Sequence, residues 1–190
     1  MKVEIVCVID RSGSMSSIRS DAIGGFNTFL KEQKSVPGEA TLTLALFDHE
    51  YITLHNAVNL RDVPELTTET YVPRGNTALY DAIGRTIDVV GSRLDKSATK
   101  PDKVIVVILT DGEENSSIEY PRARVAEMIR HQQDKYSWEF VFLAANQDAF
   151  QSGAGLNIKS SNTANFAANA KGTADAYSYI SATTASMRTP

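Results

Sequence analysis

The sequence predicts an α/β fold in which one mainly parallel sheet is covered by helices on both faces. Short apolar runs alternate along the chain with longer segments of helical periodicity, which is the pattern of consecutive βαβ units. The run 104–109 (VIVVIL) is apolar at every position, as expected of a central strand that lies between two helix layers. These two observations favour a doubly wound sheet over an all-helical or all-β protein.

Six apolar runs are predicted to be strands: residues 3–9, 40–47, 51–57, 103–110, 138–144 and 157–161. Only residues 48–50 separate the second and third runs, which is too short for a parallel crossover. These two strands should therefore form an antiparallel hairpin, with one antiparallel strand at the edge of the sheet. We expect a Rossmann-like, three-layer αβα architecture with six strands in the order 3-2-1-4-5-6.

Five segments are predicted to be helices: residues 16–34, 78–95, 121–135, 147–153 and 164–187. Apolar residues recur at helical spacing in the first three of them, and Pro121 is well placed for the first turn of the third. The last helix is rich in alanine and is expected to pack on the sheet. Its apolar stripe is predicted to consist of Phe166, Ala170, Ala174, Tyr177 and Ile180.

The composition is that of one globular domain spanning residues 1–190, without repeats or linkers. A net charge of −4 without a basic run argues against nucleic acid or a membrane as the partner. The one cysteine, Cys7, lies in an apolar strand, so a buried thiol is expected. The chain shows neither a leader pattern nor an apolar run of about 20 residues, so we expect a cytoplasmic location.

Oxygen-bearing side chains gather where the first predicted strand ends, in the stretch VCVIDRSGSM (6–15). Asp10, Ser12 and Ser14 would span about 13 Å in an extended chain, so the chain must curl if all three are to reach one ion. Gly13 makes such a curl easy. Carboxylate and hydroxyl oxygens are ligands for Mg²⁺, Mn²⁺ or Ca²⁺ rather than for zinc or copper.

Two further loops carry oxygen donors. In ILTDGEEN (108–115), a buried strand leads directly to Asp111, and PRGNTALYDA (73–82) places Thr77 just before a helix. With the strand order 3-2-1-4-5-6, the first and fourth strands are neighbours, so Asp10 and Asp111 lie at adjacent carboxyl ends. This is the switch point at which open α/β sheets bind their ligands.

These residues resemble a known metal site. Asp10-x-Ser12-x-Ser14, the Thr77 of GNTALYDA and the Asp111 of LTDG are similar to the metal-ion-dependent adhesion site (MIDAS) of von Willebrand factor type A (VWA) domains, which integrin inserted domains share. The resemblance covers nearly the whole chain. The stretches LTDGEENSS and LAANQDAF also resemble stand-alone intracellular members of bacteria and their viruses.

The resemblance implies a division of roles. Ser12, Ser14 and Thr77 would contact the cation through their hydroxyls, and Asp10 and Asp111 would hold coordinated waters. Mg²⁺ takes six oxygens, so one position would remain for an Asp or Glu of a partner protein. The expected function is therefore that of a non-catalytic, Mg²⁺-dependent protein-binding module. Its oligomeric state is left open.

Further ligand contacts are predicted at residues of the same loops: Arg11, Gly13, Arg74, Asn76 and Gly112. Arg11 and Arg74 flank the metal loops, and each has a guanidinium suited to bidentate contacts with a carboxylate or a phosphate. Alternatively, such exposed arginines simply face solvent.

Several acids have two interpretations. Asp10 and Asp111 are either metal-site residues or caps of the helices that follow them. Asp81 is interpreted as an acid at a helix start rather than a ligand. Glu113 and Glu114 either form a solvated helix-entry face or add negative charge that strengthens cation binding and repels an acidic partner.

Two other functions are considered. The cation could capture a small anionic ligand or a nucleotide phosphate, helped by Arg11 or Arg74. The chain could also be a phosphohydrolase of the haloacid-dehalogenase type, which places an Asp after its first strand beside Mg²⁺. That chemistry generally uses a second acid two residues after the nucleophile, and Ser12 stands in that place here. No alternative nucleophile and base are recognisable, so no enzymatic activity is expected.

Overall fold

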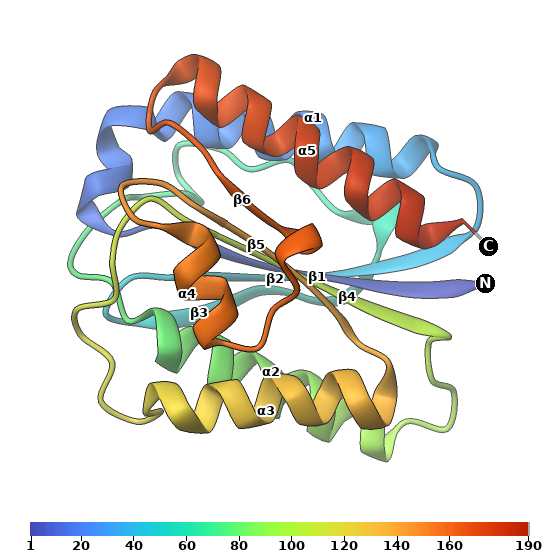
Figure 1. The fold of residues 1–190 in the computed structure, drawn as a ribbon. Helices are drawn as coiled ribbons and strands as arrows, with labels where there is room; N and C mark the ends of the chain where they lie inside the picture. Colours follow the sequence, from blue (N-terminus) through green and yellow to red (C-terminus); the bar gives the residue numbers. More distant parts are fainter. Residues whose placement is uncertain (190) are drawn as a thin grey trace.

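The computed structural model describes residues 1–189, which form a six-stranded sheet between two helix layers (Figure 1). The strand order is β3-β2-β1-β4-β5-β6, and only β3 runs antiparallel to its neighbour. This arrangement confirms the predicted fold class, the strand order and the hairpin at the edge. The strands are β1 (Lys2–Asp10), β2 (Glu39–Phe47), β3 (Tyr51–Asn59), β4 (Lys103–Thr110), β5 (Glu139–Ala144) and β6 (Thr163–Asn165).

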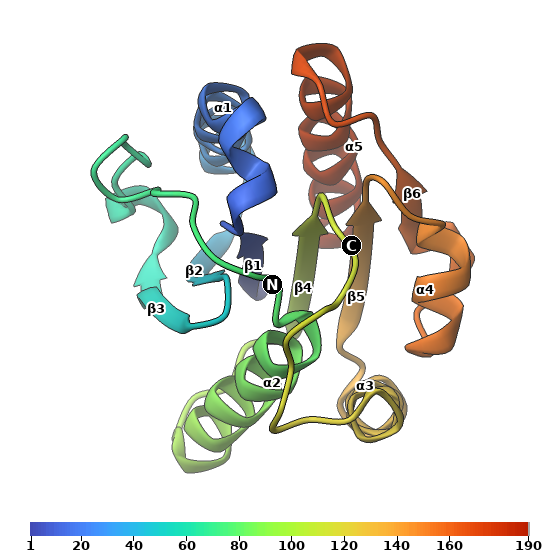
Figure 2. The same ribbon diagram turned by 90° about the vertical axis from the view of Figure 1, so that its left-hand side faces the viewer.

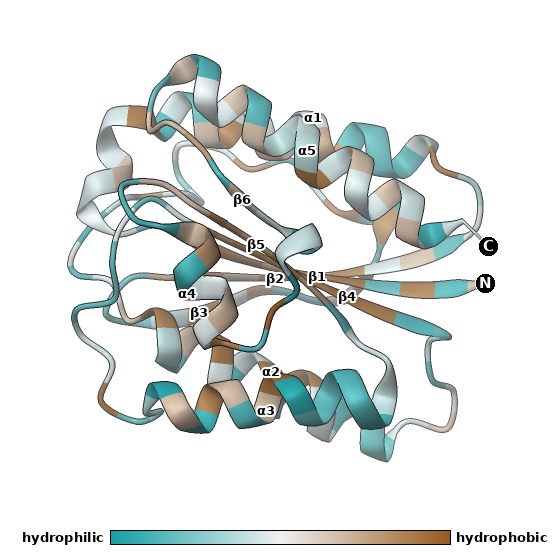
Figure 3. Ribbon diagram, viewed as in Figure 1, coloured by the Kyte–Doolittle hydropathy of each residue, from teal (hydrophilic) through white to brown (hydrophobic). Residues whose placement is uncertain are grey.

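Five α-helices of the described chain surround this sheet: α1 (Arg19–Ser35), α2 (Leu79–Lys96), α3 (Arg122–Tyr136), α4 (Ala149–Gly155) and α5 (Ala170–Arg188). Helices α1 and α5 cover one face, and α2 and α3 cover the other (Figure 2). Because successive side chains of a strand point to opposite faces, β1 serves both layers. Cys7 and Ile9 belong to the core under α1 and α5, whereas Val6 and Val8 belong to the core over α2 and α3. The brown strands at the centre of Figure 3 show this two-sided burial.

The first helix begins differently from the prediction of residues 16–34. Residues Gly13–Ile18 form a 3₁₀ helix that buries Met15 and Ile18, and the α-helix starts only at Arg19. The tight turn therefore starts within the loop that carries Ser12 and Ser14, directly after Ser12.

The predicted strand at residues 157–161 is wrong, because β6 comprises only Thr163–Asn165. Leu156 and Ile158 are buried in the core over α2 and α3, and this alternation imitates a strand. The residue between them, Asn157, has a φ of 61°, which is not a strand conformation. A loop thus buries the two side chains without pairing its backbone.

The last helix begins at Ala170 instead of 164, because Asn169 caps it by accepting a hydrogen bond from Gly172 N at 2.8 Å. Phe166 consequently precedes the helix, and Ala170 and Ala174 are exposed. The buried face contains apolar and small polar residues, namely Gly172, Thr173, Ala176, Tyr177, Ile180, Ser181, Thr184 and Arg188. The helix does pack onto α1 and the sheet, but with a face shifted from the predicted stripe.

The carboxyl ends of the parallel strands lie at one end of the molecule, at the left of Figure 1, and Figure 2 looks onto that end. The start of β1 and the end of α5 lie at the opposite end (Figure 1). There the Arg188 guanidinium donates to the carbonyl of Gln33 at 2.6 Å, at the end of α1. Within residues 1–189, no helix has the length and apolar character needed to cross a membrane.

Candidate metal centre

Two buried carboxylates lie side by side at the carboxyl end of the sheet. Asp10 is the last residue of β1, and Asp111 directly follows β4. These strands are parallel neighbours, with Ile9 opposite Leu109, so the sheet brings the two acids to adjacent strand ends. Asp10 is 0% exposed and Asp111 is 2% exposed. The position predicted for these two residues is confirmed.

The loop after β1 folds its hydroxyls toward Asp111. Ser14 Oγ donates to Asp111 Oδ1 at 2.6 Å, and Ser12 Oγ lies 3.2 Å from Ser14 Oγ. Asp10 Oδ1 accepts a hydrogen bond from Ser12 N at 2.6 Å, which closes the curl of the chain. Asp10, Ser12, Ser14 and Asp111 are thereby joined in one hydrogen-bonded cluster.

Thr77 is held at the same place by the loop that follows β4. Its N–H donates to Asn115 Oδ1 at 2.9 Å, and its carbonyl accepts from Asn115 N at 3.0 Å. A Cβ atom added at Gly112 would lie 3.7 Å from Ser14 Oγ and 3.8 Å from Thr77 Oγ1. The two hydroxyls therefore flank the same small space beside Gly112. Thr77 thus lies beside the hydrogen-bonded cluster of Asp10, Ser12, Ser14 and Asp111, and a metal role of these five residues stays a prediction.

Burial leaves these carboxylates with uncompensated negative charge. Desolvation raises the pKa of Asp10 to about 6 and also raises the pKa of Asp111. Among the ion pairs of residues 1–189, none includes either acid. Two neighbouring acids surrounded by hydroxyls, without a protein cation, fit an oxygen-liganded divalent cation. The described residues hold no group of three or more His, Cys, Asp and Glu side chains that could bind a metal in another way.

Known structures with a similar fold include proximal thread matrix protein 1 of the mussel byssus (TM-score 0.63, 14% identity, covering 97% of this chain and 46% of that protein). They also include the manganese-loaded TRAP protein of Plasmodium vivax (TM-score 0.62, 16% identity, covering 94% of this chain and 72% of that protein). A third is VWA2, an ArnB paralog of Sulfolobus acidocaldarius (TM-score 0.52, 14% identity, covering 79% of this chain and 36% of that protein). The chain spans less than half the length of the byssal protein and of VWA2.

The fold is that of a VWA domain. At 14% to 16% identity, the similarity to these proteins concerns the fold alone. No protein-family model matches the chain, and no curated protein matches it either.

Several residues that support the two acids of this VWA fold were not identified from the sequence. Thr110 Oγ1 donates to Asp10 Oδ2 at 2.6 Å, and Tyr71 Oη donates to the Asp10 carbonyl at 2.5 Å. Asn146 Nδ2 donates to the Asp111 carbonyl at 2.7 Å. Of these three residues, only Thr110 could have been noticed in the sequence, because it is a polar residue that directly follows the apolar run 104–109 in β4.

The two arginines that flank the metal loops are paired within the protein. Arg11 Nε lies 3.0 Å from Asp48 Oδ2, and Arg74 Nε donates to the same oxygen at 3.1 Å. Arg74 also pairs with Glu50. Asp48, which sequence reasoning missed, therefore pairs with both guanidiniums. Arg11 is buried and Arg74 is half-exposed, and their contacts with a ligand stay predictions.

The remaining predicted ligand contacts surround the same space. Gly13 N donates to the Gly75 carbonyl at 3.0 Å, and Gly112 adjoins Ser14 and Thr77. Asn76 is exposed in the loop that carries Thr77. The structure contains no ligand that would test contacts of Gly13, Asn76 or Gly112, so these stay predictions.

Asp81 and Glu114 anchor the long loop between β4 and α3. Asp81 lies in the first turn of α2, as interpreted, but its carboxylate accepts hydrogen bonds from the backbone of residues 118–120 at 2.8 to 2.9 Å. Glu114 accepts from the N–H groups of Tyr80 and Ser117 at 3.0 and 2.6 Å. Glu114 is therefore hydrogen-bonded at the start of α2 rather than fully solvated, whereas Glu113 is exposed, and the effect of these two charges on cation binding stays a prediction.

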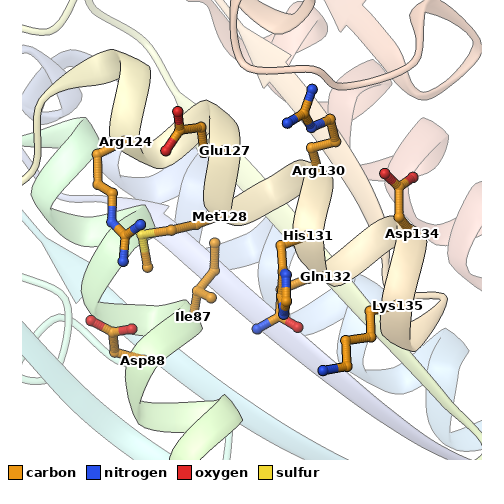
Figure 4. A pocket seen from close by; sticks show the side chains of 10 residues that line it. All are labelled: Ile87, Asp88, Arg124, Glu127, Met128, Arg130, His131, Gln132, Asp134 and Lys135. Carbon is orange, nitrogen blue, oxygen red and sulfur yellow. The ribbon is translucent and has the colours of Figure 1, made fainter.

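A separate hollow lies between α2 and α3, away from the candidate metal centre. It has a volume of about 550 Å³ and is lined by charged residues of both signs, among them Asp88, Arg124, Glu127 and Lys135 (Figure 4). None of the predicted site residues lines it. The hollow therefore plays no part in the site described above.

Proposed function

We propose that the chain is a Mg²⁺-dependent protein-binding module that captures an acidic residue of a partner, and that residues 1–190 form one VWA-type domain. The observation that supports this proposal is the cluster of Ser12, Ser14 and Asp111, in which oxygen atoms from two loops lie within hydrogen-bonding distance. No protein cation of the described chain compensates the buried charge there.

Each residue of the cluster has a role in this proposal. Ser12, Ser14 and Thr77 would hold Mg²⁺ through their hydroxyl oxygens. Asp10 and Asp111 would accept hydrogen bonds from its water ligands and balance its charge. The bound cation would supply a positive charge able to attract a carboxylate, and exposed Ser14 gives a partner access to it. With hydroxyls in place of direct carboxylate ligands, much of that charge would remain available to the partner.

The proposed metal is Mg²⁺, but Mn²⁺ and Ca²⁺ also bind oxygen ligands of this kind. The TRAP protein of similar fold is manganese-loaded, which supports the proposal that this chain binds a divalent cation. Mn²⁺ and Ca²⁺ therefore belong in the same titrations as Mg²⁺. A cytoplasmic location stays a prediction.

Isothermal titration with Mg²⁺ tests the metal site. The wild-type protein should bind Mg²⁺, and Asp10→Ala and Asp111→Ala should abolish the binding. Asp134→Ala is a matched control, because it removes an exposed acid of α3. Unchanged titration of the two site variants would remove the proposal.

Partner capture is tested by a pull-down from the native cell in the presence of Mg²⁺ or a chelator. Captured proteins should be released by chelator and displaced by excess acetate, which offers the same carboxylate chemistry. Capture that is insensitive to both treatments would contradict the proposed binding mode.

The alternative functions receive no support from the geometry. A small anion or nucleotide phosphate would use Arg11 and Arg74, but Asp48 already pairs with both. A thermal-shift screen of nucleotides with and without Mg²⁺ tests that alternative. A phosphohydrolase would need an acid at Ser12, and phosphate release from a broad substrate panel, abolished in Asp10→Asn, would be required to revive it.

A further inference from the structure

We propose that Asp48 is a positioning residue of the candidate metal centre: it holds the loop after β1 and the loop that carries Thr77 in the arrangement that a cation requires. This inference rests on the proposed function. Asp48 lies in the hairpin between β2 and β3, a segment that contributes none of the predicted metal-site residues. The proposal is supported by the contacts that Asp48 makes with Arg11 and Arg74, and it does not require Asp48 to touch the cation.

The Asp48 carboxylate is completely buried between two guanidiniums. The residue is 0% exposed, and its Oδ2 atom contacts Arg11 Nε at 3.0 Å and Arg74 Nε at 3.1 Å. Arg11 lies between Asp10 and Ser12, and Arg74 lies three residues before Thr77. One carboxylate oxygen therefore contacts both loops that supply the three proposed hydroxyl ligands.

The hairpin that carries Asp48 is itself fixed by hydrogen bonds. Asp48 Oδ1 accepts from Glu50 N at 2.6 Å, and Asp48 N donates to the Glu50 carbonyl at 2.9 Å. The Asp48 carbonyl accepts from Ala78 N at 2.9 Å, next to Thr77. The backbone of Asp48 thus holds the Thr77 loop directly, in addition to the contact through Arg74.

The two metal loops also contact each other, at the same place. Arg74 N donates to the Arg11 carbonyl at 2.8 Å, and Gly13 N donates to the Gly75 carbonyl at 3.0 Å. These contacts bring the Arg11 and Arg74 side chains to the same carboxylate. Without the negative charge of Asp48, the two guanidiniums would repel each other across this contact. The backbone contacts between the loops would then loosen, although every proposed metal ligand would still be present.

The expected consequence is a loss of preorganisation. A site whose loops are in place before the cation arrives does not lose binding free energy to ordering them. Removing the charge of Asp48 should therefore weaken Mg²⁺ binding without removing a ligand. The same change should loosen the loop contacts in the absence of metal.

Glu4 provides a matched control for the loss of a buried ion pair. It is 1% exposed on β1, pairs with Arg93 and accepts a hydrogen bond from Thr43 Oγ1 at 2.8 Å. It lies in the amino-terminal part of β1, six residues before Asp10 at the other end of the strand. Glu4→Gln therefore removes a comparable buried charge at a distance from the metal loops.

The experiment compares the wild type, Asp48→Asn, Asp48→Glu and Glu4→Gln. Mg²⁺ affinity is measured by calorimetry, and amide hydrogen exchange of Gly13 and Arg74 is measured in chelator. In Asp48→Asn we expect at least tenfold weaker Mg²⁺ binding and at least tenfold faster exchange of both amides. Asp48→Glu should restore part of the affinity. Glu4→Gln should leave the affinity within twofold, even where it lowers the free energy of unfolding.

Two results would overturn the role of Asp48: wild-type Mg²⁺ affinity in Asp48→Asn, or an equal loss of affinity in Glu4→Gln. If the wild type binds no Mg²⁺, the proposed function fails. The amide exchange measured in chelator still tests whether Asp48 holds the two loops together. Exchange of the Gly13 and Arg74 amides at wild-type rates in Asp48→Asn would then overturn the inference by itself.

Discussion

Three buried acids at the same end of the sheet are compensated in two different ways. Asp48 follows β2, Asp10 ends β1 and Asp111 follows β4, so the three lie at the ends of three neighbouring strands. The carboxylate of Asp48 has Arg11 and Arg74 as partners. The carboxylates of Asp10 and Asp111 accept hydrogen bonds from hydroxyl and backbone N–H groups instead.

This difference separates an acid that pairs within the protein from the two acids that we propose take part in cation binding. A buried carboxylate requires a compensating positive charge, or else it becomes expensive to ionise. At Asp48 the chain supplies that charge itself, and the acid is used to hold loops together. At Asp10 and Asp111 the described chain supplies no positively charged partner. The negative charge there would therefore favour binding of a cation from solution. Burial alone would not distinguish the two cases.

The largest expected effect comes from removing the acid that the protein compensates. Asp48→Ala leaves the buried guanidinium of Arg11 without its partner, so it should lower the free energy of unfolding by about 3–5 kcal/mol. Asp10→Asn removes an uncompensated charge while keeping most hydrogen bonds, so its effect should stay below about 1 kcal/mol. Urea unfolding in chelator measures both variants. Equal destabilisation by the two changes would contradict the distinction between Asp48, which is paired with arginines, and Asp10, which is not.

The second effect concerns the cation itself. Mg²⁺ at 100 times its dissociation constant should raise the free energy of unfolding by about 2.7 kcal/mol, because it binds the folded state only. Asp111→Asn should lose this increase, whereas Glu4→Gln should keep it. Urea unfolding with and without Mg²⁺ at constant ionic strength checks the expectation. An increase of the same size in Asp111→Asn would show that Mg²⁺ acts elsewhere.

A smaller effect is expected from the hydroxyl that orients Asp10. Thr110→Val removes the bond from Thr110 Oγ1 to Asp10 Oδ2, which should lower the free energy of unfolding by about 1–2 kcal/mol and weaken Mg²⁺ binding. Thr43→Val is the control, since that hydroxyl donates to Glu4. It should reduce stability with no change in the Mg²⁺ titration. A loss of affinity in the control would show that general destabilisation is responsible.

No effect of the site variants is expected at Cys7, which is buried in the middle of β1, three residues before Asp10. Burial raises the pKa of its thiol to about 12 from 9.0. The unfolded thiol therefore releases its proton above about pH 9 while the folded one keeps it, so this group lowers stability as pH rises from about 9 to 12. At pH 8 a thiol reagent should not modify Cys7 in the wild type or in Asp10→Asn. Rapid modification of Asp10→Asn would show that the change reaches the core.

Most of the fold could be predicted because its strands are long, apolar and separated by periodic helices. β1 and β4 are buried on both faces, and such runs have few other interpretations. The larger failures lie in the last part of the chain, at β6 and α5, and a smaller one is the start of α1 at Arg19 instead of residue 16. Leu156 and Ile158 alternate like strand residues but are buried by a loop, and the buried face of α5 includes Thr173 and Thr184, which a search for apolar residues overlooks.

The candidate site could be predicted only in part. Asp10, Ser12 and Ser14 are close in sequence, and the strand order brings Asp111 to them. Asp48 could not be found in the same way. It follows the strand at the other side of β1, and its role depends on the approach of Arg11 and Arg74 from two different loops. Such a contact is created by tertiary structure and leaves no local pattern.

The start of β1 and the end of α5 both lie at the end of the sheet opposite the candidate metal centre, which has a practical consequence (Figure 1). A tag joined on the outer side of either element would attach the protein to a sensor surface by the end that carries no proposed ligand. The oxygen-rich loops would then point into the flowing solution, with space for a large analyte to approach. The same protein could also be displayed in arrays, each copy presenting its loops outward.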